Sequence, residues 1–283
     1  MNAQDKDFTL FCRELTINLS TPAVMGILNV TPDSFFDGGK YNSPETALAH
    51  ATEMVNQGAQ MIDIGAASTR PGAERISEEE EWVRMEKIIP LLKEKFPNTI
   101  LSIDTYQSFV AQKAIEAGAH IINDISGGTM DDKMFETVAD LNVPYVLMHI
   151  QGTPETMQQN PVYGNVVEEV KSFFEKKIEQ LHQLGIKQII LDPGFGFGKT
   201  VEHNYQLLQS LNEFVKMSFP VLTGLSRKSM ITKLFGVGKN ETLNGTTALN
   251  TIALQKGASI LRVHDVKEAT ECVRIHNYLG SIC

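Results

Sequence analysis

Short apolar runs recur along the chain, and most of them end in a polar residue that is followed by a segment with helical spacing. This alternation is typical of βαβ units, in which buried parallel strands are covered by helices. Runs of this kind predict eight strands, at residues 24–29, 61–65, 100–104, 121–124, 145–149, 188–192, 221–224 and 260–262.

Helix start and stop signals lie between these runs. Ser77 and Glu80 have the spacing of a capping box, and Ser43 followed by Pro44 predicts an N-cap and a first helical residue. Glycines at positions 118, 185 and 257 stand where helices are expected to end. After Ser77, apolar residues three and four positions apart predict a barrel-facing stripe of Trp82, Met85, Ile89, Leu92 and Phe96.

Eight alternating strand and helix units favour a closed barrel over a doubly wound sheet, although periodicity alone does not establish closure. Residues 8–19 alternate between apolar and polar positions, which predicts a small hairpin that covers the bottom of the barrel. With 283 residues and 42% apolar content, the chain can bury such a core as one domain. The predicted fold is therefore α/β, a single (β/α)8 TIM barrel over residues 1–283 with a short N-terminal β-hairpin.

Composition narrows the range of partners. The formal net charge of −9 argues against nucleic acid, because binding it requires clustered Lys and Arg that neutralise phosphates. No apolar stretch approaches the ~18 residues of a membrane span, and the N-terminus lacks a secretory signal pattern, so we expect a cytoplasmic protein without membrane contact. Cys12, Cys272 and Cys283 lack disulfide or zinc-site spacing and are expected as free thiols.

Polar residues stand at or just past the ends of most predicted strands. Active sites of barrel enzymes are built there, because the carboxyl ends of all strands meet at one face. Simple capping of strand ends would account for one or two of these residues, but not for the repeated choice of Asp, Asn, His and Arg. The residues are Asn29, Asp63, Asp104, Asn123, Asp124, His149, Asp192, Arg262 and His264.

Several of these strand ends carry specific motifs. The first, at residues 29–39, reads Asn-Val-Thr-Pro-Asp-Ser-Phe-Phe-Asp-Gly-Gly. In order along the chain come Ser-Thr-Arg-Pro-Gly at 68–72, Ser-Ile-Asp-Thr at 102–105, Asn-Asp-Ile at 123–125, Met-His at 148–149, Asp-Pro-Gly-Phe-Gly-Phe-Gly-Lys at 192–199, Ser-Arg-Lys-Ser at 226–229 and Arg-Val-His-Asp at 262–265. Together they resemble the dihydropteroate synthase family, whose members are pterin-binding TIM barrels. An ordered set of motifs is far more specific than any one of them.

The resemblance implies a transferase of folate biosynthesis. Its small-molecule substrates would be 6-hydroxymethyl-7,8-dihydropterin diphosphate and p-aminobenzoate, which condense to 7,8-dihydropteroate with release of diphosphate. The same resemblance implies Mg²⁺ as the cofactor, a homodimer, and an enzyme of the class that sulfonamides target.

The polar edge of the pterin is expected to meet a carboxylate. This aminopyrimidinone edge has adjacent N–H donors that a carboxylate can accept in parallel, and Asp192 is the predicted partner. By resemblance, Asp104 and Asn123 complete this edge and Lys228 donates to the acceptor side of the ring. In isolation, strand-end capping would explain the carboxylates and a solvated surface position would explain the lysine. The resemblance also assigns Met148, Phe197 and Gly224 to the ring.

A leaving diphosphate requires cations and hydrogen-bond donors where negative charge develops. Arg262 and His264, at the end of the last predicted strand, meet this requirement. In the resembling family these residues and Asn29 hold the diphosphate, and Mg²⁺ bridges Asn29 and the phosphate oxygens. Mg²⁺ keeps several waters and takes few protein ligands, so the expected site needs no cage of carboxylates.

The second substrate, p-aminobenzoate, is expected where a helix begins after the seventh predicted strand. Ser229 and neighbouring backbone N–H groups can receive its carboxylate. By resemblance, Thr69, Arg70 and Pro71 close over it. An ordinary helix cap would also explain a serine at this place.

The expected mechanism is dissociative and similar to SN1. The diphosphate-binding groups stabilise the leaving group while the pterin ring supports a cation at its methylene carbon, which the amine then attacks. Loops at residues 29–40 and 66–77 are expected to exclude water, with Asp37 stabilising the cation and Arg70 ordering the closed loops. The predicted catalytic residues are Asp37, Arg70, Lys228, Arg262 and His264.

Two positions of the sequence depart from the family pattern. Ala66-Ala67 stands where relatives often carry Gly-Glu, and Phe36 replaces a residue that is often small.

A folate-binding methyltransferase barrel that passes methyl to a corrinoid partner would share the pterin-binding Asp and Asn, but this function gives no reason for the anion sites. A Schiff-base aldolase using Lys228 and a non-enzymatic pterin-binding barrel are further alternatives.

Overall fold

The structure is a computed structural model that describes residues 8–31, 44–68 and 75–282. Its strands form a two-stranded antiparallel sheet and an eight-stranded sheet. The antiparallel pair is β1 (Thr9–Cys12) and β2 (Leu15–Asn18). The larger sheet contains β3 (Ala23–Asn29), β4 (Met61–Gly65), β5 (Ile100–Asp104), β6 (Ile121–Asp124), β7 (Tyr145–Met148), β8 (Ile189–Asp192), β9 (Leu222–Thr223) and β10 (Ile260–Val263).

The eight-stranded sheet curves into a nearly closed barrel. Its strand order is β8-β7-β6-β5-β4-β3-β10-β9, and every pairing is parallel. The two ends of this order meet where Leu191 and Val221 form a parallel bridge and Leu191 N donates to Pro220 O at 2.9 Å. The expected barrel is confirmed, and each predicted strand agrees with the observed one to within one residue at either end.

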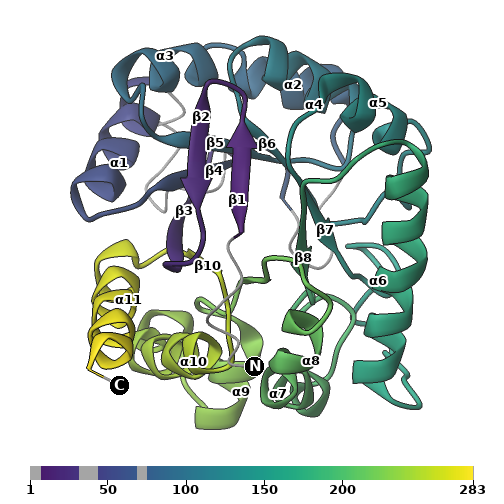
Figure 1. The fold of residues 1–283 in the computed structure, drawn as a ribbon, viewed down its shortest axis with the longest axis vertical. Helices are drawn as coiled ribbons and strands as arrows, with labels where there is room; N and C mark the ends of the chain where they lie inside the picture. The colour runs from purple at the N-terminus through teal and green to yellow at the C-terminus, as the bar shows by residue number, and fades with distance from the viewer. Residues whose placement is uncertain (1–7, 32–43, 69–74, 283) are drawn as a thin grey trace.

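Helices surround the barrel on its outside (Figure 1). Gly118, Gly185 and Gly257 follow three of them with φ values of +114°, +82° and +95°, so the predicted helix stops adopt the left-handed conformation that glycine tolerates. None of the helices in the described part of the chain is long and apolar enough to cross a membrane. The helices are α1 (Pro44–Asn56), α2 (Glu78–Met85), α3 (Ile88–Lys95), α4 (Ser108–Glu116), α5 (Met134–Leu141), α6 (Val166–Gln183), α7 (Val201–Gln209), α8 (Leu211–Val215), α9 (Ser229–Phe235), η2 (Lys239–Glu241, a 3-10 turn), α10 (Leu243–Gln255) and α11 (Val266–Ser281).

The apolar stripe that follows Ser77 lies on two helices rather than one. The Ser77 side chain caps α2 by accepting from Glu80 N at 3.2 Å, which is the first half of the predicted capping box. The Glu80 carboxylate accepts from Arg84 Nη2 at 2.6 Å instead of completing the box. Helix α2 ends at Met85, and α3 begins at Ile88. Pro90 explains the break, because its ring would clash with the carbonyl group four residues earlier and it has no N–H to donate.

The N-terminal hairpin packs against the bottom of the barrel, and in Figure 1 β1 and β2 lie across that end. Leu10 and Cys12 of β1 form an apolar cluster with residues near the amino ends of the barrel strands, among them Met61 and Ile100. The Gln188 side chain pairs with the Phe11 backbone, accepting from Phe11 N at 2.6 Å and donating to Phe11 O at 3.1 Å. The predicted position of the hairpin is therefore confirmed.

Candidate active site

The carboxyl ends of the parallel strands bring polar residues from distant parts of the sequence to one mouth of the barrel. Strand register decides which of them become neighbours, because residues in register lie side by side across the sheet. The pairs at the mouth are Asn29 with Gly65, Gly65 with Asp104, Asp104 with Asn123, and Met148 with Asp192.

An ion network lies at the centre of this mouth. Arg262 donates from Nε to Asp63 Oδ2 and from Nη2 to Asp104 Oδ2, both at 2.6 Å. Asp63 is fully buried and also accepts from Ser102 Oγ at 2.6 Å and from Asn123 Nδ2 at 2.9 Å. A buried carboxylate with three donors organises two predicted site residues, Arg262 and Asn123, around itself.

Asp63 was noted as a strand-end polar residue but was not predicted to belong to the site. Its neighbour two residues earlier, Met61, packs inside the barrel, whereas Ile62 and Ile64 belong to the layer between sheet and helices. Side chains alternate between the two faces of a strand, so Asp63 points into the barrel. A single carboxylate at an inward position of an apolar strand was the sequence signal for its role.

Asp104 lies in the mouth, where its surroundings act on the pKa of its carboxyl group in opposite directions. Burial raises the pKa of its carboxyl group to about 7, with nearby Asp63 and Glu81 adding to the rise, while the Arg262 guanidinium opposes it. Two carboxylates thus share one guanidinium in a low-dielectric space. Arg262 keeps further N–H donors beyond the two it uses here, since a guanidinium carries five.

Asp192 and Lys228 form a second polar group at the mouth. Asp192 Oδ1 accepts from Gly194 N at 2.8 Å. Burial raises the pKa of the Asp192 carboxyl group and lowers that of the Lys228 amine to about 8, and each charge partly offsets the effect on the other. The Lys228 ammonium donates to Phe195 O and lies 4.6 Å from the centroid of the Phe197 ring. A planar ligand with donors and acceptors along one edge suits this arrangement.

An apolar surface borders the polar groups. Asn123 Oδ1 is buried and has no hydrogen-bond partner among the described residues, so it remains available as an acceptor. A Cβ on Gly224 would lie 3.8 Å from Lys228 Nζ, which places Gly224 beside the Lys228 ammonium. The apolar cluster comprises Ile125, Met148, Ile150 and Met157, with Tyr106 and Phe197 packed against it.

Lys199 supports the loop that follows β8, a role that sequence reasoning missed although the residue ends a quoted motif. It is 3% exposed, and its Nζ lies 3.0 Å from Gly194 O, 2.9 Å from Phe197 O and 3.0 Å from His149 Nδ1. Burial lowers the pKa of Lys199 to about 7 and that of His149 to about 2. His149 therefore lies beneath the loop as a neutral support.

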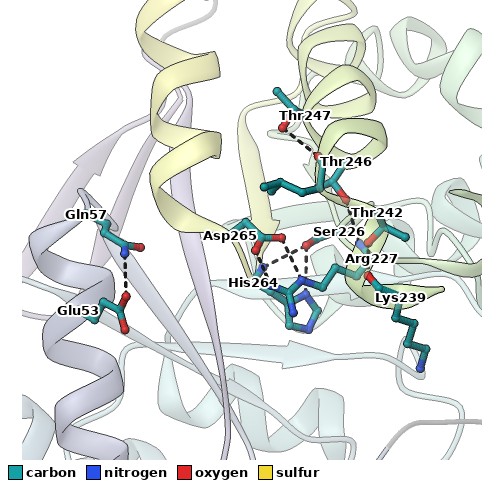
Figure 2. A network of polar contacts seen from close by, with 11 residues as sticks. Glu53, Gln57, Ser226, Arg227, Lys239, Thr242, Thr246, Thr247, His264 and Asp265 are labelled. Carbon is teal, nitrogen blue, oxygen red and sulfur yellow. Dashed lines mark hydrogen bonds and ion pairs between the residues drawn. The ribbon is translucent and has the colours of Figure 1, made fainter. Parts of the chain in front are cut away.

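His264 stands at the rim of the mouth in a second polar network (Figure 2). Ser226 Oγ lies 3.2 Å from His264 N and 3.1 Å from His264 Nδ1, and Arg227 Nε donates to Asp265 Oδ2 at 3.0 Å. Ser229 is the exposed first residue of α9, and the preceding N-cap is Lys228, which makes no side-chain cap bond. Simple helix capping therefore does not account for Ser229.

Some predicted residues lie outside the described part of the chain. Asp37 and Phe36 belong to residues 32–43, and Thr69, Arg70 and Pro71 belong to residues 69–74. The departure at Ala66 is described, and its carbonyl oxygen accepts from Arg84 Nη1 at 2.8 Å. Within the described ranges, no group of three or more His, Cys, Asp or Glu side chains is arranged to hold a metal ion.

Comparison with known proteins identifies the family. Residues 25–264 match the family described as pterin binding enzyme. Dihydropteroate synthase of Escherichia coli (strain K12) is 47% identical over 268 residues, 94% of this chain and 94% of the relative. The solved structure of Yersinia pestis dihydropteroate synthase with a sulfonamide drug complex is 44% identical with a TM-score of 0.92, covering 97% of this chain and 100% of that one. Xanthomonas albilineans dihydropteroate synthase with 4-aminobenzoic acid is 39% identical with a TM-score of 0.91, covering 97% and 98%. The chain therefore belongs to the dihydropteroate synthase family of pterin-binding enzymes.

Proposed function

We propose that this protein is a transferase of folate biosynthesis, which condenses 6-hydroxymethyl-7,8-dihydropterin diphosphate with p-aminobenzoate to give 7,8-dihydropteroate and diphosphate. The observation that carries this proposal is a single barrel mouth in which Asp104, Asn123 and Asp192 lie with Lys228 and Arg262. Membership of the family supports the same reaction. The methyl-transfer alternative has no comparable support in this chain.

The pterin binds along the polar groups of the mouth. Asp192 accepts from adjacent N–H groups of the aminopyrimidinone edge, and Asn123 Oδ1, which is buried and lacks a described partner, accepts a further hydrogen bond. Asp104 completes this edge, and Lys228 donates to the acceptor side of the ring. The flat faces of the ring pack against Met148 and Phe197, which border the polar groups.

The diphosphate binds at Asn29, Arg262 and His264. A Cβ on Gly65 would lie 3.7 Å from Asn29 Oδ1 and 3.6 Å from Asp104 Oδ2, so oxygen donors of the type that Mg²⁺ prefers border this part of the mouth. Asn29 is the residue of this chain that would hold Mg²⁺. When bound, the ion supplies positive charge that stabilises the leaving group. Arg262 adds the N–H donors that Asp63 and Asp104 do not occupy.

The p-aminobenzoate carboxylate binds at Ser229 and the nearby backbone N–H groups, and Thr69, Arg70 and Pro71 are further residues of this substrate site. Asp37 stabilises the cation at the pterin methylene carbon once the diphosphate has left. The relative from Xanthomonas albilineans was solved with 4-aminobenzoic acid, and that from Yersinia pestis with a sulfonamide. We therefore place sulfonamide binding in the p-aminobenzoate site of this protein.

The protein acts as a cytoplasmic homodimer that binds neither nucleic acid nor membranes. An exposed apolar stripe along α11 supports a contact between two copies. Ile275, Tyr278 and Leu279 are each more than half exposed, and their spacing places them on one helix face. Sedimentation at several protein concentrations measures the mass: a monomer at all of them would contradict the dimer.

The decisive experiment incubates the purified protein with Mg²⁺ and both substrates and separates the products by chromatography. We expect diphosphate and 7,8-dihydropteroate in equal amounts. If neither product forms although circular dichroism shows folded protein, the proposed reaction is wrong. Tight folate binding that does not depend on a diphosphate group would then favour the methyl-transfer alternative.

A further inference from the structure

Ser226 and His264 are linked through a single hydroxyl oxygen (Figure 2). Ser226 follows β9 and His264 follows β10, so two neighbouring loops meet at this point. The Ser226 side chain is almost fully buried, and its Oγ lies 3.2 Å from the backbone N and 3.1 Å from the ring Nδ1 of His264.

The arrangement of hydrogens at this oxygen follows from its two neighbours. A backbone N–H is only a donor, so His264 N donates to Ser226 Oγ. The serine hydroxyl carries one hydrogen of its own, and among the described residues the acceptor within reach is His264 Nδ1. If Nδ1 carried a proton instead, Oγ would accept twice and its own hydrogen would remain unpaired in a nearly dry position. An unpaired buried donor costs about 1–3 kcal/mol, so Nδ1 is the acceptor.

The surroundings of the ring keep it neutral. Although the residue is partly exposed, burial by the surrounding protein lowers the pKa of His264, and the guanidiniums of Arg262 and Arg227 lower it further. The Lys228 ammonium acts in the same direction, whereas the Asp265 carboxylate opposes it. Asp265 is itself paired with Arg227. In a neutral imidazole whose Nδ1 accepts, the proton resides on Nε2.

We propose that Ser226 is a positioning residue that holds His264 in the tautomer with the proton on Nε2. The ring then offers a hydrogen-bond donor to an oxygen of the leaving diphosphate. The opposite tautomer would turn a lone pair toward phosphate oxygens and repel them. This role of the donor rests on the proposed function, whereas the tautomer itself is a property of the free protein.

Nitrogen-15 NMR of the histidine rings tests the tautomer without any substrate. Long-range proton–nitrogen correlation distinguishes a protonated Nε2 from a protonated Nδ1, and the signals of His264 are those that disappear in His264→Asn. At pH 7.5 we expect His264 in the parent protein to be protonated on Nε2 alone. We expect a mixture of both tautomers in Ser226→Ala and the parent pattern in Ser226→Thr, which retains the hydroxyl. A proton on Nδ1 in the parent, or an unchanged pattern in Ser226→Ala, would overturn the proposal.

Two further measurements separate positioning from general damage. Thr246→Val is the matched control, because Thr246 Oγ1 accepts from Arg227 N at 3.2 Å in the same network but does not bond His264; it should leave the His264 tautomer unchanged. Calorimetric titration with inorganic diphosphate and Mg²⁺ should show about tenfold weaker binding to Ser226→Ala and parent affinity for Ser226→Thr. A tenfold loss in both serine variants would contradict a role for the hydroxyl. If the parent protein shows the expected NMR pattern but forms no product, the result counts against the proposed function and not against the tautomer.

Discussion

Arg262 Nε lies 2.6 Å from a carboxylate oxygen of Asp63, which is completely buried on the inner side of β4. The two residues are 199 positions apart in the chain and belong to strands separated by β3. The same guanidinium reaches Asp104 on β5. One side chain on the last strand therefore holds two carboxylates from the first half of the sequence, in the part of the mouth where we place the diphosphate.

Removing the charge of Asp63 should destabilise the fold. Asp63→Asn leaves Arg262 with one anionic partner in a buried place, and we expect a loss of about 3 kcal/mol in the free energy of unfolding. Ser102→Ala is the control, because it removes only a neutral donor to the same carboxylate and should cost about 1 kcal/mol. Urea unfolding measures the free energy of unfolding of both variants. Equal losses would show that the charge pair stabilises the fold no more than the neutral hydrogen bond does.

Two glycines with similar backbone angles should respond differently to a methyl group. Gly194 and Gly185 have φ values of +69° and +82°. A Cβ on Gly194 would lie 1.9 Å from His149 O, whereas a Cβ on Gly185 would have nothing within 4 Å. We expect Gly185→Ala to cost about 1 kcal/mol from the left-handed backbone alone and Gly194→Ala about 3 kcal/mol or more. Comparable melting temperatures for the two variants would contradict the close packing of the loop after β8.

His149 should make stability depend on pH on the acid side of neutrality. Burial lowers its pKa from 6.5 to about 2, so below pH 6.5 the unfolded chain binds a proton that the folded protein does not. Stability from this group is therefore complete above pH 6.5 and is lost as pH falls. In His149→Gln the loss is absent, and the stability gap to the parent should narrow by about 1.4 kcal/mol per pH unit below about pH 6. Denaturation curves at several pH values check this, and a constant gap would refute it.

Asp192→Asn tests the pterin edge. The amide keeps the shape of the side chain but presents one acceptor where the carboxylate presents two, so parallel acceptance from two N–H groups is lost. We expect the Kd for the pterin diphosphate to rise about 100-fold, which corresponds to about 2.7 kcal/mol. Asp140→Asn, on the exposed face of α5, is the control and should bind as the parent does. Calorimetric titration gives both constants, and an unchanged Kd for Asp192→Asn would remove this residue from the pterin site.

A dissociative mechanism makes a prediction about the order of events. The parent protein should release diphosphate slowly from the pterin substrate when p-aminobenzoate is absent, because the bond breaks before the amine attacks. Arg262→Ala should slow this cleavage by about 100- to 1000-fold, since it removes donors from developing charge. Rapid-quench measurements follow the diphosphate. If cleavage strictly requires p-aminobenzoate, direct displacement is the mechanism instead.

The strands and the barrel were predictable because their signals are local. Parallel strands covered by helices are short runs of apolar residues, and their ends were located to within one residue. The apolar spacing after Ser77 predicts a stripe of buried side chains but does not indicate where the backbone helix breaks. Pro90 carried that information, since a proline inside a helical pattern ends or kinks the helix.

The candidate site was predictable only in part. Strand ends and motifs pointed to Asp104, Asn123, Asp192 and Arg262, because every carboxyl end of a barrel strand faces the same mouth. Lys199 was part of a motif, but its burial beneath the loop depends on how the segments after β7 and β8 pack together.

The sequence by itself therefore determined the strands and most of the polar residues at the mouth. Only the tertiary structure decided which side chains form hydrogen bonds or ion pairs with each other. Asp63 with Arg262 and Ser226 with His264 are pairs formed across different strands and loops, and no local pattern specifies them. The physical reason is that hydrogen bonds and ion pairs gain their strength from burial in a common low-dielectric space, which exists only once the barrel has closed.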